Sequence, residues 1–320
     1  MKIIVFGGKG FIGRHLSFLL EKKNKVFVYG NKDYSRKGNN LIKYNKLNFI
    51  KILRKIRPDV IYFLSGNSYP NNTINDGLYD FKSTNLIIQE LLSALKKISY
   101  NKLFIYTSSI AVYGSVKSKQ HVNEKFRVNP ESFYGNSKYL AEKQIEYFSK
   151  ISKFNSVVLR LSSVYGPGLK RQIIYEIIKN SIHSNLLRFN GSIKDKRQFL
   201  FVDDCAQMLN KLIYKKHKKF DIYNIANGKK IKILDLIKFV QKILNKKISI
   251  KFLNNFKSPV LPALSNNKFK KNIGSIKYTN IEKGLLETLK WIKNKKFLLN
   301  KFFLFFSYSS FLNFNNLYNR

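Results

Sequence analysis

Cysteine is nearly absent from this sequence, which has one thiol, Cys205, among its 320 residues. A single thiol cannot close a disulfide within the chain or build a cysteine-rich metal site, so we expect no metal centre. Proline is also scarce, with six residues, and no linker or internal repeat divides the chain. With 44% hydrophobic residues, this length suits one large domain or two closely joined ones around a substantial core.

Long apolar runs are absent as well, because none approaches the roughly 20 residues that a membrane-spanning helix needs. The most apolar segment, Phe302–Leu312, lies in an aromatic-rich tail over residues 293–320. We interpret this tail as a packing or poorly ordered segment in preference to a membrane contact. Met1-Lys2 leads directly into the apolar Ile3–Phe6, which leaves no room for a signal peptide, so a cytoplasmic protein is the default expectation.

Acidic residues are few: 18 Asp and Glu stand against 60 Lys and Arg, which gives a formal net charge of +42. Such a charge is typical of proteins that bind nucleic acids or anionic membranes. Here the lysines are dispersed among abundant Asn, Ile, Phe and Tyr, and no nucleic-acid-binding motif occurs. We therefore attribute the charge to an AT-rich genome and expect no specific nucleic-acid partner, although a positive field can attract a phosphorylated substrate.

Apolar runs alternate with helical patterns along the chain, which predicts an α/β fold with a doubly wound parallel sheet. Strands are expected over Lys2–Gly7, Lys25–Tyr29, Leu41–Tyr44, Val60–Leu64, Lys102–Thr107, Ser156–Leu161 and Asp221–Ile225. Helices are expected over Ile12–Lys23, Ile50–Ile56, Thr84–Lys97, Tyr134–Lys150 and Gln172–Ser181. The pattern changes after Leu161, which indicates a smaller C-terminal lobe.

Three glycines, Gly7, Gly10 and Gly13, follow the first strand and open an amphipathic helix. The first lets the chain leave the strand sharply, the second removes a side chain where a pyrophosphate approaches, and the third lets the helix pack closely on the sheet. The helix N-terminus, at Phe11 and Ile12, then faces the phosphates. In this context the spacing predicts a dinucleotide-binding turn.

The end of the second strand bears on the choice of cofactor. Sites that prefer NAD place an acid there to bind the ribose 2′-OH, whereas this chain has Gly30 followed by Asn31 and Lys32, with Arg36 nearby. A missing acid beside cations suits a 2′-phosphate, so we favour NADP slightly over NAD. Two alternatives stay open: Asp33 takes the acidic role, or the cations reflect composition only.

A Tyr-x-x-x-Lys pair, Tyr134 and Lys138, follows a strand that ends in small hydroxyl residues. Of these, Ser109 is the best placed to bind a substrate oxygen. Lys138 lies one helical turn from Tyr134, so its charge is expected to lower the pKa of the tyrosine, and it can reach a nicotinamide ribose. Tyr134 is therefore predicted to move a proton while hydride is transferred at the adjacent carbon.

Together these residues resemble the extended short-chain dehydrogenase/reductase family, also called the NAD-dependent epimerase/dehydratase family, from Lys2 to about Trp291. Beyond the glycine turn, the likeness rests on Ser65-Gly66, Asn85, Thr107–Gly114, Tyr134–Lys138 with Glu142, Leu159–Gly168, Arg197–Phe199, Val202–Asp204, Tyr223–Ile225 and Gly284–Trp291. The resemblance implies a nucleotide-sugar substrate and a homodimer formed through the helices around 84–97 and 134–150. It implies an NAD(P)-binding Rossmann domain over 1–165 with a returning strand near 221–225, and a mainly substrate-binding lobe over 166–292.

The resemblance also assigns roles to individual residues. The catalytic residues are Ser109, Tyr134 and Lys138. The substrate-binding residues are Ser109, Tyr134, Ser163 in place of the usual Asn, and Arg197 as the phosphate-binding arginine. The cofactor-binding residues are Gly7, Gly10, Phe11, Ile12, Gly13, Asn31, Lys32, Arg36, Asn45, Leu64, Ser65, Gly66, Asn85 and Lys138.

Departures from the family pattern narrow the expected reaction. The sugar 4,6-dehydratases and the related decarboxylases carry an acid after the catalytic Ser/Thr, where this chain has Ile110 and Ala111. Neither residue exchanges a proton, so we do not expect dehydration. The 3,5-epimerase-reductases use a Cys/His pair. Cys205 is poorly placed for this role, and His183, although in the right broad region, lies on a helical pattern, so we interpret it as structural.

Three readings follow from these features. The first is a nucleotide-sugar 4-epimerase, in which the C4 hydride leaves and returns to the other face of a transient 4-keto sugar. The second is a reductase that uses NADPH to reduce a nucleotide-linked 4-keto sugar. The third, a non-catalytic dinucleotide sensor, is disfavoured because a sensor needs only the glycine turn. Synthesis of cell-surface polysaccharide precursors is implied by the family alone.

Overall fold

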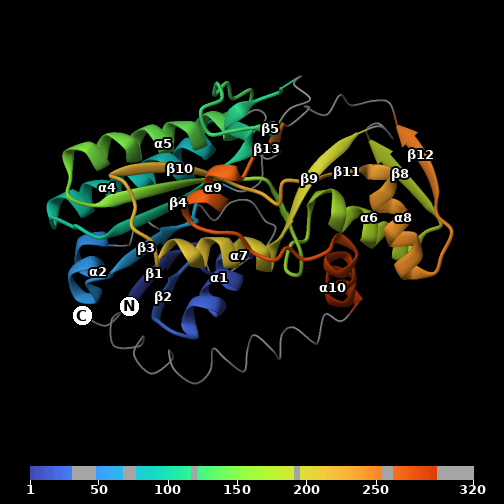
Figure 1. Cartoon of the computed structure of the whole chain (residues 1–320), viewed down its shortest axis with the longest axis horizontal. Helices are drawn as coiled ribbons and strands as arrows, with labels where there is room; N and C mark the ends of the chain where they lie inside the picture. The colour runs from blue at the N-terminus through green and yellow to red at the C-terminus, as the bar shows by residue number, and fades with distance from the viewer. Residues whose placement is uncertain (31–47, 68–76, 117–120, 191–194, 254–261, 294–320) are drawn as a thin grey trace.

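The computed structural model describes residues 1–30, 48–67, 77–116, 121–190, 195–253 and 262–293. Its centre is a six-stranded parallel sheet in the order β10-β6-β4-β3-β1-β2 (Figure 1). The strands are β1 (Lys2–Phe6), β2 (Lys25–Tyr29), β3 (Val60–Phe63), β4 (Leu103–Ser109), β6 (Asn155–Leu161) and β10 (Phe220–Ile225). The predicted α/β class is thereby confirmed, while the predicted strand Leu41–Tyr44 lies outside the described residues.

Helices cover both faces of this sheet, because successive strand residues point to opposite sides. Ile3 and Val5 of β1 pack with α1 (Phe11–Glu21) and α7 (Val202–Leu212). Ile4 and Phe6 pack on the other face, with α2 (Phe49–Ile56), α4 (Ile87–Lys97) and α5 (Phe133–Ile151) (Figure 1). No helix in the described ranges is long and apolar enough to cross a membrane.

The helix expected over Thr84–Lys97 is longer and less regular than the sequence pattern indicates. This helical region begins with α3 (Gly77–Asp80), continues through the π-helical segment η3 (Phe81–Leu86), and becomes a regular α-helix only in α4. Wide turns of this kind are rare and often occur at functional sites. The hydrophobic period of α4 could not reveal this wide turn, since the turn precedes the regular apolar pattern.

A smaller lobe lies at one end of the molecule, beyond the large sheet (right in Figure 1). Its sheets are β11-β9-β7 and β12-β8, and its helices α6, α8 and α10 enclose a separate apolar core. A short pair, β13-β5, the helix α9 and the 3-10 helix η4 (Ile110–Tyr113) complete the described elements. The bounds are β5 (His121–Val122), β7 (Ser163–Tyr165), α6 (Gln172–His183), β8 (Leu186–Asn190), β9 (Lys196–Phe201), β11 (Lys230–Lys232), α8 (Ile233–Leu244), β12 (Ser249–Leu253), β13 (Ala263–Leu264), α9 (Asn267–Asn272) and α10 (Ile281–Lys293).

The close packing of α1 on the sheet depends on Gly13. A Cβ atom there would collide with the carbonyl oxygen of Gly7 and lie 2.6 Å from the Cα atom of Gly8. We therefore expect Gly13→Ala to lower the free energy of unfolding by about 1–3 kcal/mol. Gly10→Ala is the control, because its Cβ would lie 3.0 Å from the Gly7 oxygen, and its expected loss is below about 1 kcal/mol. Urea denaturation measures both, and equal losses would contradict this account.

Candidate active site

The glycine turn after β1 has the geometry that a pyrophosphate requires. Gly7 adopts a φ of 81°, and its N–H donates to the Tyr29 oxygen at 2.8 Å. A Cβ atom at Gly7 would lie 2.7 Å from the carbonyl carbon of Leu64, so a larger residue does not fit. Helix α1 begins directly afterwards, with no side-chain cap at Gly10 and no acid in its first turn. Its N-terminal amides, at Phe11, Ile12 and Gly13, therefore suit a bound phosphate.

The turn after β3 lies beside this glycine turn. Leu64 donates its N–H to the Phe6 oxygen at 2.8 Å, and Ser65 is buried. Gly66 has a φ of 120°, and a Cβ atom there would lie 2.6 Å from Thr84 Oγ1. The three predicted cofactor residues of this turn thus share the carboxyl edge of the sheet with the glycine turn.

Asn85, another predicted cofactor residue, belongs to η3 and is buried where this segment meets α5. Its Nδ2 donates to the Ser137 oxygen at 2.9 Å, and its Oδ1 accepts from Ser137 Oγ at 2.6 Å. In this structure its amide therefore ties η3 to α5. The remaining predicted cofactor residues Asn31, Lys32, Arg36 and Asn45 lie outside the described residues.

The predicted catalytic residues come together at the end of β4. Ser132 caps α5 by accepting from the Gly135 N–H at 3.0 Å, which places Tyr134 in the first turn of that helix. Ser109, the last residue of β4, hydrogen-bonds Tyr134 through its side chain. Lys138 lies one turn further along α5, and its Nζ donates to the Thr107 oxygen at 3.2 Å. Two elements thus hold all three side chains.

The ionisation of Lys138 is strongly affected by its surroundings. Its side chain is only 5% exposed, and burial lowers the pKa of the amine to about 8. The negative charges of Asp80 and Glu142 act in the other direction and raise this pKa. Its Nζ lies 5.2 Å from the ring centroid of Tyr106 and 5.8 Å from that of Tyr134. A buried lysine of this kind is a typical feature of a functional site.

The pKa of Tyr134 is raised in this structure. Burial is the main cause, and the charge of Asp80 adds to it. The hydrogen bond from Ser109 and the charge of Arg171 act in the opposite direction. The sequence led us to expect a lowered pKa through Lys138, but burial outweighs the groups that favour the tyrosinate.

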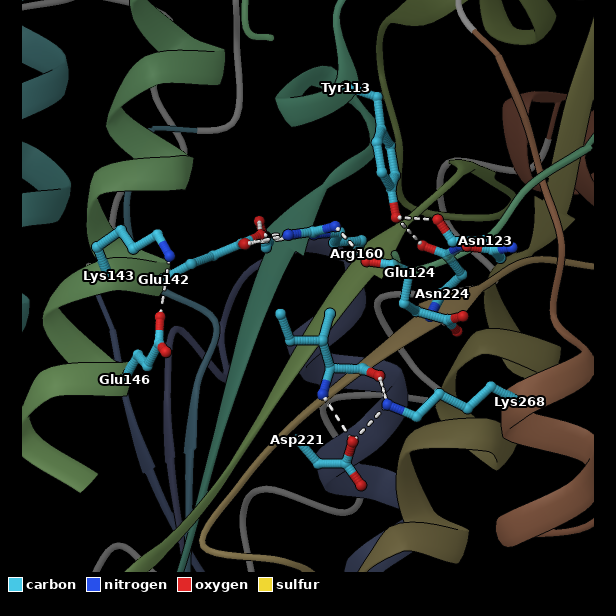
Figure 2. A network of polar contacts seen from close by, with 12 residues as sticks. Tyr113, Asn123, Glu124, Glu142, Lys143, Glu146, Arg160, Asp221, Asn224 and Lys268 are labelled. Atoms are coloured by element: carbon cyan, nitrogen blue, oxygen red, sulfur yellow. Dashed lines mark hydrogen bonds and ion pairs between the residues drawn. The ribbon is translucent and has the colours of Figure 1, made fainter. Parts of the chain in front are cut away.

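A buried ion pair joins Arg160 to Glu142, which lies one helical turn after Lys138 on α5 (Figure 2). Arg160 of β6 and Glu142 of α5 are 3% and 2% exposed, and their Nη2 and Oε2 atoms are 2.7 Å apart. Ser108 Oγ donates to Glu142 Oε1 at 2.5 Å, and the Arg160 guanidinium lies 4.8 Å from the Tyr113 ring centroid. The Tyr113 hydroxyl donates to Asn224 Oδ1 of β10 at 2.8 Å. The network therefore joins β4, α5, β6 and β10, and it includes Ser108, the neighbour of Ser109 in the sequence.

The predicted substrate residues Ser163 and Arg197 lie in the neighbouring sheet β11-β9-β7. Ser163 of β7 pairs with Phe199 of β9, and Arg197 lies two positions before Phe199. The side chains of Ser163 and Arg197 therefore face the same side of that sheet. Burial lowers the pKa of the Arg197 guanidinium, and the charge of Asp195 opposes this. In the described part of the chain, no hydrogen bond links Ser163 or Arg197 to the Ser109, Tyr134 and Lys138 group.

Two charged residues near this group were missed by sequence reasoning. Asp80 and Arg171 both act electrostatically on Tyr134. Asp80 lies five residues before Asn85, and Arg171 lies four residues after Pro167. Their proximity to recognised segments was the only available signal, because neither forms a spacing pattern with the Tyr-x-x-x-Lys pair.

A doubly wound sheet with a glycine turn and a Ser-Tyr-Lys group at its carboxyl edge defines a dinucleotide-dependent enzyme of the short-chain dehydrogenase class. Residues 3–226 match the family described as the NAD dependent epimerase/dehydratase family. The chain belongs to this family, whose members act on nucleotide sugars.

Known relatives of this chain have different activities. A dTDP-D-glucose 4,6-dehydratase of Dictyostelium discoideum is 29% identical over 272 residues, which cover 76% of this chain and 62% of that protein. An uncharacterized UDP-glucose epimerase of Bacillus subtilis is 26% identical over 273 residues, covering 79% of this chain and 85% of that protein. The structure of UDP-glucuronic acid 4-epimerase from Bacillus cereus, in complex with UDP-glucuronic acid and NAD, has a TM-score of 0.80 at 23% identity, covering 92% of this chain and 100% of that one. This last likeness confirms the fold.

Helix α5 provides a matched test of the buried ion pair (Figure 2). We expect Glu142→Gln to lower the free energy of unfolding by about 3–5 kcal/mol, because it leaves Arg160 charged and buried without its partner. The control is Glu146→Gln on the same helix, where the pairs with Lys143 and Lys150 are both solvent-accessible and each contributes about 0–1 kcal/mol. Urea denaturation should separate the two variants clearly. Similar losses would show that the buried pair contributes no more to the free energy of unfolding than the exposed pairs do.

Proposed function

We propose that this protein is an NAD(P)-dependent nucleotide-sugar 4-epimerase that acts through a transient 4-keto sugar. The observation that carries the proposal is the Ser109–Tyr134 hydrogen bond beside the buried Lys138, at the same sheet edge as the glycine turn. The relatives named as epimerases support it.

The proposed roles follow from the positions of the side chains. The nicotinamide, when bound, supplies the hydride acceptor and donor. Tyr134 takes the proton of the sugar 4-OH and later returns it, while Ser109 holds the same oxygen by a hydrogen bond. Lys138 supplies positive charge beside the phenol and would hold the ribose of a bound cofactor. Rotation of the keto sugar between the two steps would invert C4.

Dehydration is disfavoured by the residues after Ser109. Ile110 and Ala111 begin the 3-10 helix η4 (Ile110–Tyr113), and neither can accept or donate a proton. The Dictyostelium relative carries the name of a 4,6-dehydratase, yet loss of water needs a general acid and base that these two positions lack.

The alternative is an NADPH-dependent reductase of nucleotide-linked 4-keto sugars. The residues around Tyr134 suit either reaction, because reduction needs the same proton donor without the return step. Gly30 favours this alternative, since it leaves no carboxylate to bind a ribose 2′-OH. A non-catalytic sensor is the weakest candidate, because it has no need of the Ser109–Tyr134 hydrogen bond.

We also propose that residues 166–292 form the substrate lobe, with Arg197 binding the diphosphate and Ser163 the sugar. An arginine suits this task because its planar guanidinium pairs with two phosphate oxygens. We propose a homodimer formed through α4 and α5. It is supported by exposed apolar side chains of α5, namely Phe133, Leu140 and Tyr147, of which Tyr147 is 61% exposed. These residues are seven apart and share one helix face.

The first test is to denature the purified protein and identify any released nicotinamide by mass spectrometry. An epimerase recycles its hydride, so we expect retained, mainly oxidised cofactor and, by NMR, interconversion of C4 epimers of a UDP-sugar. Empty protein that binds NADPH in preference to NADH, and that only reduces a 4-keto sugar, would support the alternative.

Tyr134→Phe should retain cofactor binding and lower turnover by about 10²- to 10⁴-fold, because it removes the proton-transferring hydroxyl. Tyr214→Phe, in the segment that follows α7, is the control: its ring is 54% exposed and the proposal gives it no role in catalysis or dimer formation, so we expect no loss of activity. Cofactor binding is measured by fluorescence titration and turnover by NMR. Retained turnover in Tyr134→Phe would refute the assigned role.

The slight preference for NADP is tested at Gly30. A Cβ atom there would lie 3.3 Å from Lys9 Cβ, so a side chain fits with a small shift. If the preference exists, Gly30→Asp should move the NADP-to-NAD affinity ratio toward NAD by about tenfold or more, since the carboxylate repels a 2′-phosphate. Gly30→Ala controls for the added atom. An unchanged ratio in Gly30→Asp would remove the NADP assignment.

A further inference from the structure

Asp80, the last residue of α3, is a buried acid to which the proposed chemistry gives no role. Its side chain is 1% exposed. Oδ1 accepts a hydrogen bond from Asn67 Nδ2 at 2.7 Å, whereas Oδ2 is buried and has no hydrogen-bond partner among the residues that the structure describes. An incompletely paired carboxylate in the interior is costly, so its retention here requires a compensating interaction.

The neighbours of Asp80 connect the two halves of the site. Asn67 directly follows the Ser65-Gly66 turn, and its N–H donates to Thr84 Oγ1 at 3.3 Å. On the other side, the backbone oxygen of Asp80 accepts from Ser137 Oγ at 3.2 Å. Ser137 immediately precedes Lys138, so Asp80 lies between the turn after β3 and the catalytic helix.

The charge of Asp80 has no contact partner of opposite sign. Among the described residues, no cation lies within ion-pair distance of its carboxylate. Glu142, the other acid that acts on Lys138, is neutralised by its ion pair with Arg160. The Lys138 amine donates to the neutral carbonyl of Thr107. Asp80 and Lys138 are therefore the two buried charges that are left to balance each other.

We propose that Asp80 is a positioning residue that keeps Lys138 protonated and ties the catalytic helix to the Ser65–Asn67 turn. Its effect on turnover rests on the proposed function, whereas its effect on Lys138 does not. The other groups that face the pair are Glu142 on α5, Tyr106 on β4 and Arg171 before α6. All of these remain when Asp80 is changed.

The charge of Asp80 raises the pKa of Lys138 and also that of Tyr134. Without it, the amine loses its proton at lower pH, and the phenol ionises at lower pH as well. For a reaction that needs the tyrosinate and the ammonium together, both limbs of the pH profile therefore move in the same direction. A residue that only supported the fold would lower the rate without moving either limb.

Asp80→Asn is the sharpest variant, because the amide oxygen can still accept from Asn67 while the charge is lost. We expect both limbs of the kcat/KM profile to shift to lower pH by on the order of one unit. Glu21→Gln, the same loss of charge at the exposed last residue of α1, should leave the profile unshifted. An unshifted profile for Asp80→Asn would overturn the proposal. If Asp80→Asn does not fold, Asp80→Ser makes the same test with a smaller side chain.

A second measurement does not depend on the reaction. Trace acetylation of the cofactor-free protein at a series of pH values, followed by peptide mass spectrometry, gives the pKa of the Lys138 amine. We expect about 8 in the unchanged protein and a lower value in Asp80→Asn. Equal values would refute the role of Asp80, even if the protein proved not to be an epimerase. A lowered value in a protein without epimerase activity would leave this inference standing and remove only the proposed function.

Discussion

Burial of the Lys138 ammonium at the end of an apolar sheet is the constraint on which the site depends. Water cannot solvate this charge fully, so protein groups must replace it. The Thr107 carbonyl, Asp80 and Glu142 supply this environment from three elements. Glu142 in turn is paired with Arg160. Burial alone would lower the pKa of the Arg160 guanidinium, but its hydrogen bonds and charge interaction with Glu142 raise that pKa above its ordinary value. One buried amine thus depends on polar groups from β4, α3, α5 and β6.

Parallel strands explain why so much chemistry converges at one edge. All six strands of the large sheet run in the same direction, so the turns that follow them meet at their carboxyl ends. The Gly7 turn, the Gly66 turn and Ser109 come from β1, β3 and β4, three consecutive positions in the sheet order. The apolar cores on both faces make this arrangement rigid, and rigid placement is what proton and hydride transfer require.

The same fold accommodates several reactions, and single side chains decide between them. The chain belongs to a family that includes both epimerases and dehydratases. The apolar Ile110 and Ala111 lack the proton-exchanging groups that dehydration would need, and we propose that Tyr134 and Ser109 supply those that oxidation at an alcohol carbon needs. Family membership therefore gives the cofactor class and the substrate class, and the immediate neighbours of Ser109 favour a particular outcome.

The sequence by itself determined the sheet, the glycine turn and the Tyr134–Lys138 pair, because each depends on local spacing: a period of two, a three-residue glycine repeat and one helical turn. It also indicated Ser109, since a strand end is a local signal. Asp80, Arg171 and the π-helical turn appeared only in the tertiary structure. Their importance arises from electrostatic interactions between groups distant in sequence, with burial strengthening those interactions by excluding water. Burial also reversed the expected direction of the Tyr134 pKa, which no pattern of residues along the chain could have indicated.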